Sequence, residues 1–185
     1  MSKFLFSFKF VQGLIIIFML SPVVIFSQND EKVRISPKAI VQQTVGFTDV
    51  TIEYSRPGVK KRKIWGGLVP YHVVWRAGAN EATKIIFSMD VKINGKKLEA
   101  GSYSFFAVPT KDTWFLIFNK DSNQWGAFEY NEAEDALRIE VTPEEGYQQE
   151  WLAYTITKTS YNSAIINLEW EKLRVPFTVE VDIQK

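Results

Sequence analysis

Residues 50–55 read Val-Thr-Ile-Glu-Tyr-Ser, a strict alternation of apolar and polar side chains. A period of two places the apolar side chains on one face of a β-strand and the polar side chains on the other. The same alternation recurs at residues 137–142 and 177–182. Each of these stretches therefore predicts a strand in a sheet that turns one face toward a hydrophobic core.

Turn signals separate further apolar segments of strand length. Residues 91–98 read Val-Lys-Ile-Asn-Gly-Lys-Lys-Leu, and the Asn-Gly pair supplies the positive φ angles of a two-residue hairpin turn. Residues 103–108 and 114–118 flank a Pro-Thr-Lys-Asp cluster, which predicts a second hairpin. The remaining predicted strands are residues 40–45, 84–88, 151–157 and 164–170.

The spacing of these segments indicates the fold class. About ten short strands separated by turn signals are typical of a sandwich or barrel. Helical periodicity is nearly absent, and we expect at most one helical turn, at residues 131–136. The sequence therefore predicts an all-β fold: an antiparallel β-sandwich, jelly-roll-like, of about ten short strands.

The N-terminus has the layout of a secretory signal peptide. Two lysines precede an apolar stretch at residues 14–26, which is shorter than the roughly 20 residues that a membrane-spanning helix needs. Polarity changes abruptly after Ser27, so we expect cleavage between Ser27 and Gln28. The predicted organisation is a signal peptide at residues 1–27, an N-terminal linker at 28–36 and a single domain at 37–185.

Charge and cysteine content exclude several classes of protein. Removing residues 1–27 from the chain of 185 would leave 158 residues, with 20 basic side chains against 21 acidic ones because only two lysines are lost. This near-neutral balance argues against nucleic acid as a partner. The chain has no cysteine, which excludes thiol catalysis, zinc–thiolate sites, disulfides and a lipid-modified cysteine as an anchor. We expect a soluble exported protein, periplasmic or extracellular, of bacterial type.

The alternation fails between Tyr54 and Thr83, where one long connection concentrates aromatic residues, glycine and proline. Such loops are usually functional or packed by their own side chains. Six residues in it are candidate ligand-binding residues, because together they offer aromatic faces, guanidinium forks, an amide and a carboxylate for a sugar or a carboxylate-bearing metabolite. They are Tyr54, Arg56, Trp75, Arg76, Asn80 and Glu81. The alternative is an internal scaffold, with an Arg–Glu ion pair, Asn80 capping the loop backbone, Trp75 packed beneath and Gly78 in a turn.

Several motifs in this region and on either side of it resemble those of a known family. They are Ser36-Pro37-Lys38-Ala39, Tyr54-Ser55-Arg56-Pro57, the stretch 63–70, the stretch 74–83 and Phe118-Asn119-Lys120-Asp121. Together they resemble the domain-of-unknown-function 2911 family of exported bacterial proteins, over residues 36 to about 182. The resemblance implies export, but it brings no activity, cofactor or catalytic residue to carry over.

Candidate catalytic and metal-binding residues are few. The one histidine, His72, excludes a multi-histidine metal site, and we interpret it as a loop residue. Residues 121–132 place Asp, Asn, Gly and Glu at positions 1, 3, 6 and 12 of a calcium loop, but position 5 is Trp125 and the flanks read as strands. A polar turn is the plainer interpretation, so we predict no metal and no cofactor.

Three functional classes follow from these patterns. We prefer a binding or accessory domain with one loop-lined pocket for a small polar ligand or glycan. The alternatives are a glycan hydrolase, using Glu81 with Glu53 or Asp135 as its carboxylate pair, and a structural envelope protein without a small ligand. Of the tryptophans, we expect Trp114 in the core, and Trp75 and Trp125 exposed.

Overall fold

The computed structural model describes residues 33–183, which form an antiparallel β-sandwich of ten strands. This confirms the predicted all-β class. The strands are β1 (Lys38–Val45), β2 (Thr48–Ser55), β3 (Thr83–Phe87), β4 (Val91–Ile93), β5 (Lys96–Leu98), β6 (Gly101–Val108), β7 (Trp114–Asn119), β8 (Asp135–Val141), β9 (Glu144–Lys158) and β10 (Ser163–Val181). The predicted helical turn is a short 3-10 helix, η1 (Glu132–Glu134). The predicted signal peptide lies outside the described residues.

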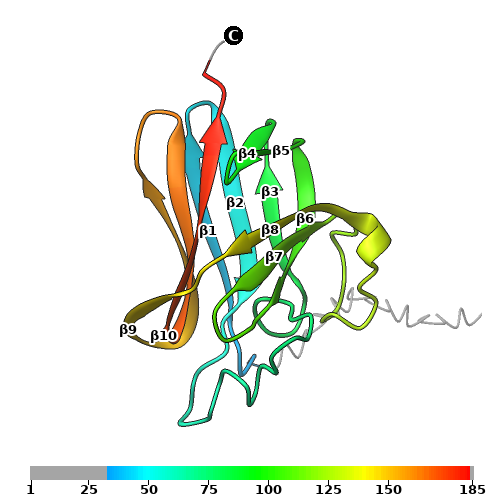
Figure 1. Ribbon diagram of the computed structural model, residues 1–185, viewed down its shortest axis with the longest axis vertical. Coiled ribbons are helices and arrows are strands. Elements are labelled where there is room, and N and C mark those ends of the chain that lie inside the picture. Colours follow the sequence, from blue (N-terminus) through cyan, green and yellow to red (C-terminus); the bar gives the residue numbers. More distant parts are fainter. Residues whose placement is uncertain (1–32, 184–185) are drawn as a thin grey trace, which may run out of the picture. The chain divides into compact units, whose positions relative to one another are not determined.

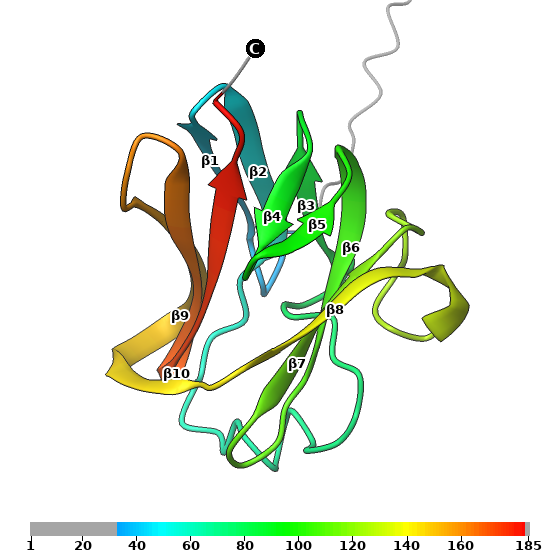
Figure 2. The ribbon, with the colours of Figure 1, turned by 45° about the horizontal axis from the view of Figure 1, so that its top comes forward.

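The strands form two sheets that pack face to face. The first sheet has the order β1-β2-β3-β6-β7-β8, and the second has the order β5-β4-β10-β9. Figure 2 shows β4, β5 and β10 in front of β2 and β3, and Figure 1 shows β9 and β10 as a long curved hairpin at one side. The alternation seen in the sequence explains this packing, because Val50 and Ile52 of β2 are fully buried between the sheets.

The hairpin of β4 and β5 forms at the Asn-Gly pair, as the sequence predicts. Asn94 has φ 47° and Gly95 has φ 78°, which are the two positive angles of a type I′ turn. The Asn94 side chain also reaches the neighbouring strand β10, where its Oδ1 accepts hydrogen bonds from Thr178 N at 2.7 Å and from Thr178 Oγ1 at 3.0 Å. The turn therefore anchors the hairpin to β10 as well as closing it.

The separate strands predicted at residues 164–170 and 177–182 are one continuous strand, β10, and in this respect the prediction is wrong. The pairing of β10 with β9 shifts register on both sides of Glu171, which has φ 56°. These irregularities bend the strand and let it continue. Pro176 is tolerated because it falls between the residues that pair with β9 and those that pair with β4, so the ladder loses no hydrogen bond there.

Two apolar clusters hold the described residues together. The large one fills the space between the sheets and includes Trp114, which is fully buried as predicted. A smaller cluster of Ala82, Phe106 and Ile117 lies on the outer face of the first sheet, where Tyr130 packs against it. No helix in residues 33–183 is long and apolar enough to cross a membrane.

Candidate functional site

The long connection between β2 and β3, residues 56–82, has a well-defined path. It is bonded to β9 by Val59 N–Glu150 O at 2.8 Å and by Leu152 N–Pro57 O at 3.0 Å. Five non-glycine residues in it have left-handed backbone angles: Lys60, Lys61, His72, Ala77 and Asn80. Each such residue costs of order 1–2 kcal/mol and persists only where the surroundings determine it. The surroundings of the loop therefore determine its path.

Trp75 lies in the core, so the prediction that it is exposed is wrong. Its ring is 9% exposed and stacks on Trp170 at 5.9 Å, with Trp65 and Trp114 edge-on to it. The indole Nε1 donates to Gly78 O at 3.2 Å. Polar neighbours in the sequence suggested exposure, but Trp75 pairs as a short strand with β6 and turns its side chain inward.

Tyr54 and Arg56 connect the loop to β9. The Tyr54 hydroxyl accepts a hydrogen bond from Tyr154 N at 3.2 Å, and the two rings meet edge-to-face at 4.8 Å. Arg56 Nε donates to Leu152 O at 2.8 Å. Both side chains thus use their polar atoms to hold β2 and the start of the loop against β9.

Glu81 is the most strongly paired carboxylate of the described residues. Its two oxygens accept hydrogen bonds from both terminal nitrogens of Arg34, at 2.7 and 2.8 Å, and Lys38 Nζ lies 3.4 Å away. The Arg34 hydrogen bonds are the main cause that lowers the pKa of Glu81 from 4.5 to about 2. The ion pair of the loop therefore joins Glu81 to Arg34, not to Arg76.

The segment before β1 is fastened to the same loop. Asn80 Nδ2 donates to Ser36 O at 3.3 Å, and Arg56 N donates to Pro37 O at 2.9 Å. With the Arg34–Glu81 ion pair, these bonds tie residues 34–37 to the two ends of the long connection. Arg56, Asn80 and Glu81 thus act locally as anchors for the chain that enters the domain.

Beside Glu81 the surface is hollowed to a volume of about 480 Å³, and we call this the Trp125 hollow. It lies where β1, β2, β3 and the loop after β7 meet. Its lining residues are Lys38, Ala39, Ile40, Glu53, Tyr54, Ser55, Glu81, Ala82, Lys84, Ser122, Asn123, Gln124 and Trp125. Trp125 is 59% exposed, in agreement with the prediction. It pairs with Glu81 through an antiparallel bridge, which holds the aromatic ring and the carboxylate on neighbouring strands.

The polar groups of this hollow continue a row that crosses the outer face of the first sheet. Residues directly opposite one another on paired strands point to the same face. The pairing registers place six residues in line, one from each strand: Ile40, Glu53, Lys84, Ser104, Asn119 and Asp135. Lys84 Nζ donates to Asn123 Oδ1 at 2.8 Å, so the loop after β7 closes over the middle of the row. Only the part toward β1 stays open.

The structure brings two of the six predicted binding residues to the Trp125 hollow. Tyr54 and Glu81 line it, whereas Arg56, Trp75, Arg76 and Asn80 do not. The sequence reasoning did not single out the strand residues Lys38 and Lys84. Their signal was present in the alternation of β1 and β3, which turns both lysines to the outer face, but only the pairing of the strands reveals that they meet.

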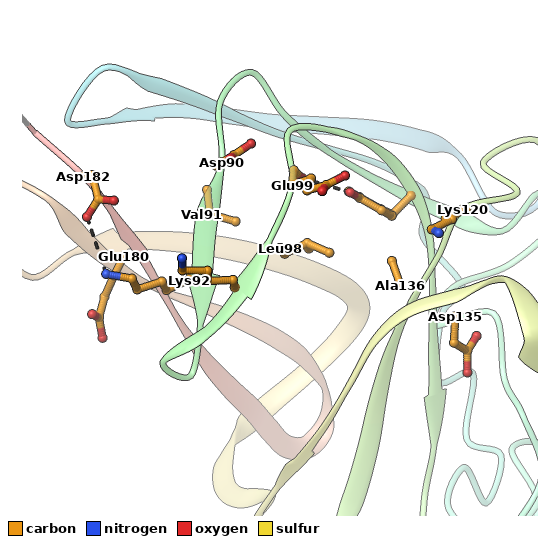
Figure 3. A pocket seen from close by; sticks show the side chains of 12 residues that line it. Asp90, Val91, Lys92, Leu98, Glu99, Lys120, Asp135, Ala136, Glu180 and Asp182 are labelled. Atoms are coloured by element: carbon orange, nitrogen blue, oxygen red, sulfur yellow. Dashed lines mark hydrogen bonds and ion pairs between the residues drawn. The ribbon is translucent and has the colours of Figure 1, made fainter. Parts of the chain in front are cut away.

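A second hollow, of about 570 Å³, lies between the β4–β5 hairpin and β8. Figure 3 shows its charged rim, with Lys92 paired to Asp182 at 3.5 Å and with Asp90, Glu99 and Asp135 around it. Several of these groups already have partners: Asp90 accepts from Ala100 N, and Asp135 accepts from Tyr130 and Asn119. This second hollow contains no exposed aromatic platform and none of the six predicted binding residues.

The carboxylates considered for catalysis lie in two different places. Glu53 and Glu81 both line the Trp125 hollow, whereas Asp135 lines the second hollow. A glycosidase needs one carboxylic acid that is protonated near neutral pH to donate a proton to the leaving group. The lowered pKa of Glu81 keeps this group ionised and therefore unsuited to that role.

The segment that resembles a calcium loop uses its oxygens within the protein. Asp121 Oδ1 accepts a hydrogen bond from Asn123 N at 3.3 Å, and Asn123 Oδ1 accepts from Lys84. No group of three or more histidine or carboxylate residues that could hold a metal ion occurs within residues 33–183. His72 is exposed on the loop, and its backbone N donates to Pro109 O at 2.8 Å.

Comparisons with known proteins give one match. A family model described as "Protein of unknown function (DUF2911)" matches residues 36–179, which include both sheets, the long connection and the Trp125 hollow. No curated protein and no solved structure matches the chain.

Proposed function

The chain belongs to the DUF2911 family, whose description assigns no activity, and we propose that it is a binding or accessory domain that holds a glycan in the Trp125 hollow. The observation that carries this proposal is an exposed tryptophan at the edge of a hollow rich in hydrogen-bonding side chains. Sugars present both an apolar face and a ring of hydroxyl groups. A site of this composition matches both parts.

Trp125 is suited to stacking because its position is fixed before any ligand arrives. The strand-like pairing around it includes Ala82 N–Gln124 O and Gly126 N–Asn80 O, both at 3.0 Å. These two hydrogen bonds flank Trp125 on either side. The backbone that carries the Trp125 ring is therefore already ordered before a ligand binds. A site that is ordered in advance loses less entropy on binding, which favours affinity.

The polar lining offers donors and acceptors without a large net charge. Lys38 and Lys84 supply ammonium donors, and Glu53 and Glu81 supply carboxylate acceptors. Sugar hydroxyl groups both donate and accept hydrogen bonds, so a lining with both kinds of group is complementary to them. We favour binding over hydrolysis because Arg34 holds Glu81 ionised, which removes it as a proton donor, and because both Glu81 oxygens already accept hydrogen bonds from Arg34.

Isothermal titration calorimetry with soluble oligosaccharides tests this function. We expect at least one of the cello-, malto-, laminari- and chito-oligosaccharides to bind. Trp125→Ala then weakens binding about tenfold or more, which corresponds to about 1.4 kcal/mol. Tyr147→Ala is the matched control, because Tyr147 is also an exposed aromatic residue, at 99%, but does not line the hollow.

Two results would contradict the proposal. Equal affinity of Trp125→Ala and the wild type would exclude stacking on this residue. A screen in which no sugar binds and none shifts the melting temperature at saturating concentration would favour a structural protein without a small ligand.

The proposal also places the domain outside the cytoplasm, in the periplasm or the extracellular medium. It rests on the lysines, the short apolar stretch and the polarity change within residues 1–28. Expression of the full chain in a bacterium, followed by N-terminal sequencing of the exported product, tests it. We expect Gln28 as the first residue, and a product that stays in the cytoplasm with residues 1–27 intact would contradict the proposal.

A further inference from the structure

Arg76 differs from the other arginines of the described residues in having no partner. Each of the other five donates a hydrogen bond to a carboxylate or a backbone carbonyl: Arg34, Arg56, Arg62, Arg138 and Arg174. The Arg76 side chain makes no hydrogen bond or ion pair with residues 33–183, and its Nε is buried. Burial lowers the pKa of Arg76 because it removes water from the guanidinium.

The structure fixes the backbone that carries this guanidinium, although no side chain within residues 33–183 pairs with its charge. Trp75, the preceding residue, exchanges two backbone hydrogen bonds with Ala107, at 2.7 and 2.8 Å, and its ring is locked in the core. The Arg76 carbonyl accepts from Thr83 N at 3.2 Å. A positively charged group that is partly buried, unpaired and attached to a fixed backbone is an energetically unfavourable arrangement, which an external anion would relieve.

Gly126 borders the Arg76 fork, next in the chain to Trp125. Arg76 Nη1 lies 3.6 Å from the position that a Cβ at Gly126 would take, and the Phe128 ring lies 2.8 Å from the same position. Gly126 also has φ 71°, so a side chain here would be both strained and in collision. Arg76 Nη1 therefore lies close to Gly126, the residue that follows Trp125 of the hollow's lining.

Two other unpartnered polar atoms belong to the same outer face. Ser104 Oγ and Gln124 Oε1 are buried without a hydrogen-bond partner among the described residues. Ser104 stands opposite Asn119 in the polar row, and Gln124 Nε2 donates to Asn119 Oδ1 at 3.1 Å. With Arg76 Nε, these atoms are three of the five buried polar atoms without a partner in residues 33–183; the others are two tryptophan nitrogens, of Trp65 and Trp170.

We propose that Arg76 is the subsite for a carboxylate of the ligand, and that the glycan bound beside it is therefore an acidic one. A guanidinium binds a carboxylate through two parallel hydrogen bonds, a geometry that a neutral sugar cannot supply. Because Gly126 follows Trp125 and borders Arg76, we place the next unit of a chain that stacks on Trp125 beside Arg76. The proposal rests on the proposed glycan function for its ligand, but the anion site itself can be tested separately.

The anion site is tested first without any glycan, by titrating the protein with sodium acetate and recording the arginine Nε–H signals by NMR. The Arg76 signal is assigned by its loss in Arg76→Gln. We expect a saturable shift of this signal at millimolar acetate, with no saturation for Arg174, whose Nε and Nη2 already donate to Glu144. An unchanged Arg76 signal, or a response equal to that of Arg174, would overturn the proposal.

The glycan arm compares oligogalacturonate, oligomannuronate and hyaluronan fragments with the neutral oligosaccharides, by calorimetry. We expect an acidic chain to bind at least tenfold more tightly than any neutral one. Arg76→Gln should remove that preference, and Arg76→Lys, which keeps the charge but loses the fork, should restore part of it. Since Arg76 has no partner to lose, both variants should fold, which circular dichroism verifies.

The two arms separate the two ideas. Binding of neutral glycans that depends on Trp125, with no preference for acidic chains and no effect of Arg76→Gln, would overturn the carboxylate subsite and leave the glycan function standing. A saturable acetate response at Arg76 in a protein that binds no glycan would leave the anion site standing and overturn the glycan function.

Discussion

Glu81 is surrounded by cations, with Arg34 bonded to both carboxylate oxygens and Lys38 within 3.4 Å. The Glu81 carboxylate lines the Trp125 hollow and also holds the segment before β1 through Arg34. Its role in stability can be measured separately from its role in binding, because its charge titrates in an accessible pH range.

We predict that Glu81→Gln lowers the free energy of unfolding by about 1 kcal/mol at pH 7, a value kept small because the side chain is one-third exposed. The folded state lowers the pKa of this group from 4.5 to about 2, so its contribution is complete above pH 4.5 and is lost as the pH falls toward 2. Urea unfolding of both proteins at pH 7, 4 and 2 should show the difference vanish.

Glu132→Gln is the control for this measurement, because Glu132 also pairs with an arginine but its side chain is 73% exposed. We expect it to change the stability by less than about 0.5 kcal/mol. A Glu81→Gln variant with the same stability as the wild type at pH 7 would show that the Arg34 pair contributes nothing to folding.

Single residues of the candidate site were only partly predictable. Glu81 stands out in the sequence as a carboxylate in an unusual loop, but its partner Arg34 lies 47 positions away, and no local pattern connects them. The polar sequence neighbours of Trp75 predict an exposed side chain, whereas its orientation depends on a bridge to Ala107 in β6. Which face a loop residue presents is decided by tertiary pairing that the sequence does not display.

Among the elements, the β4–β5 hairpin is defined most completely by its own residues. The Asn-Gly turn predicted both strands and their connection, and the structure adds the two hydrogen bonds from Thr178 to Asn94. These bonds add to the pairing of β4 with β10, which makes the hairpin part of the second sheet.

We predict that Asn94→Gly lowers the free energy of unfolding by about 1 kcal/mol, because glycine keeps the left-handed turn but removes the acceptor of both Thr178 hydrogen bonds. Asn94→Asp retains an acceptor oxygen and should stay within about 0.5 kcal/mol of the wild type. Thermal unfolding of the three proteins distinguishes the two roles of the residue. Equal losses in both variants would mean that the hydrogen bonds are not responsible.

Strands were predictable where alternation is strong, as in β2, β8 and the end of β10, because burial of one face imposes the period. The continuity of β10 could not be predicted, because the residues around the bend at Glu171 interrupt the alternation of apolar and polar side chains. The path of residues 56–82 was equally hidden, because left-handed positions occupied by lysine, histidine and alanine carry no sequence signal comparable to glycine.

At the scale of the whole domain, four tryptophans join the sheets and the loop. Trp75 and Trp65 come from the long connection, Trp114 from β7 in the first sheet and Trp170 from β10 in the second. Their rings lie between 4.8 and 6.5 Å apart. The loop that borders the candidate site is therefore continuous with the core.

We predict that Trp75→Ala lowers the free energy of unfolding by about 3–5 kcal/mol, the usual cost of removing a buried aromatic ring. Trp125→Ala is the matched control, because its ring is 59% exposed and should change stability by less than about 0.5 kcal/mol. Guanidinium unfolding monitored by circular dichroism compares the two. Similar losses in both would mean that the tryptophan cluster does not support the fold.

The left-handed residues of the long connection limit which substitutions can accumulate there during evolution. Ala77 and Asn80 hold φ angles of 49° and 59°, and a side chain at Gly78 would come within 2.8 Å of Thr83 Oγ1. Few substitutions suit a backbone that is twisted and crowded at once. In evolutionary terms, this stretch should drift slowly while exposed strand faces change freely. Distant homologues would then be recognisable by their loop even after their sheets have ceased to look alike.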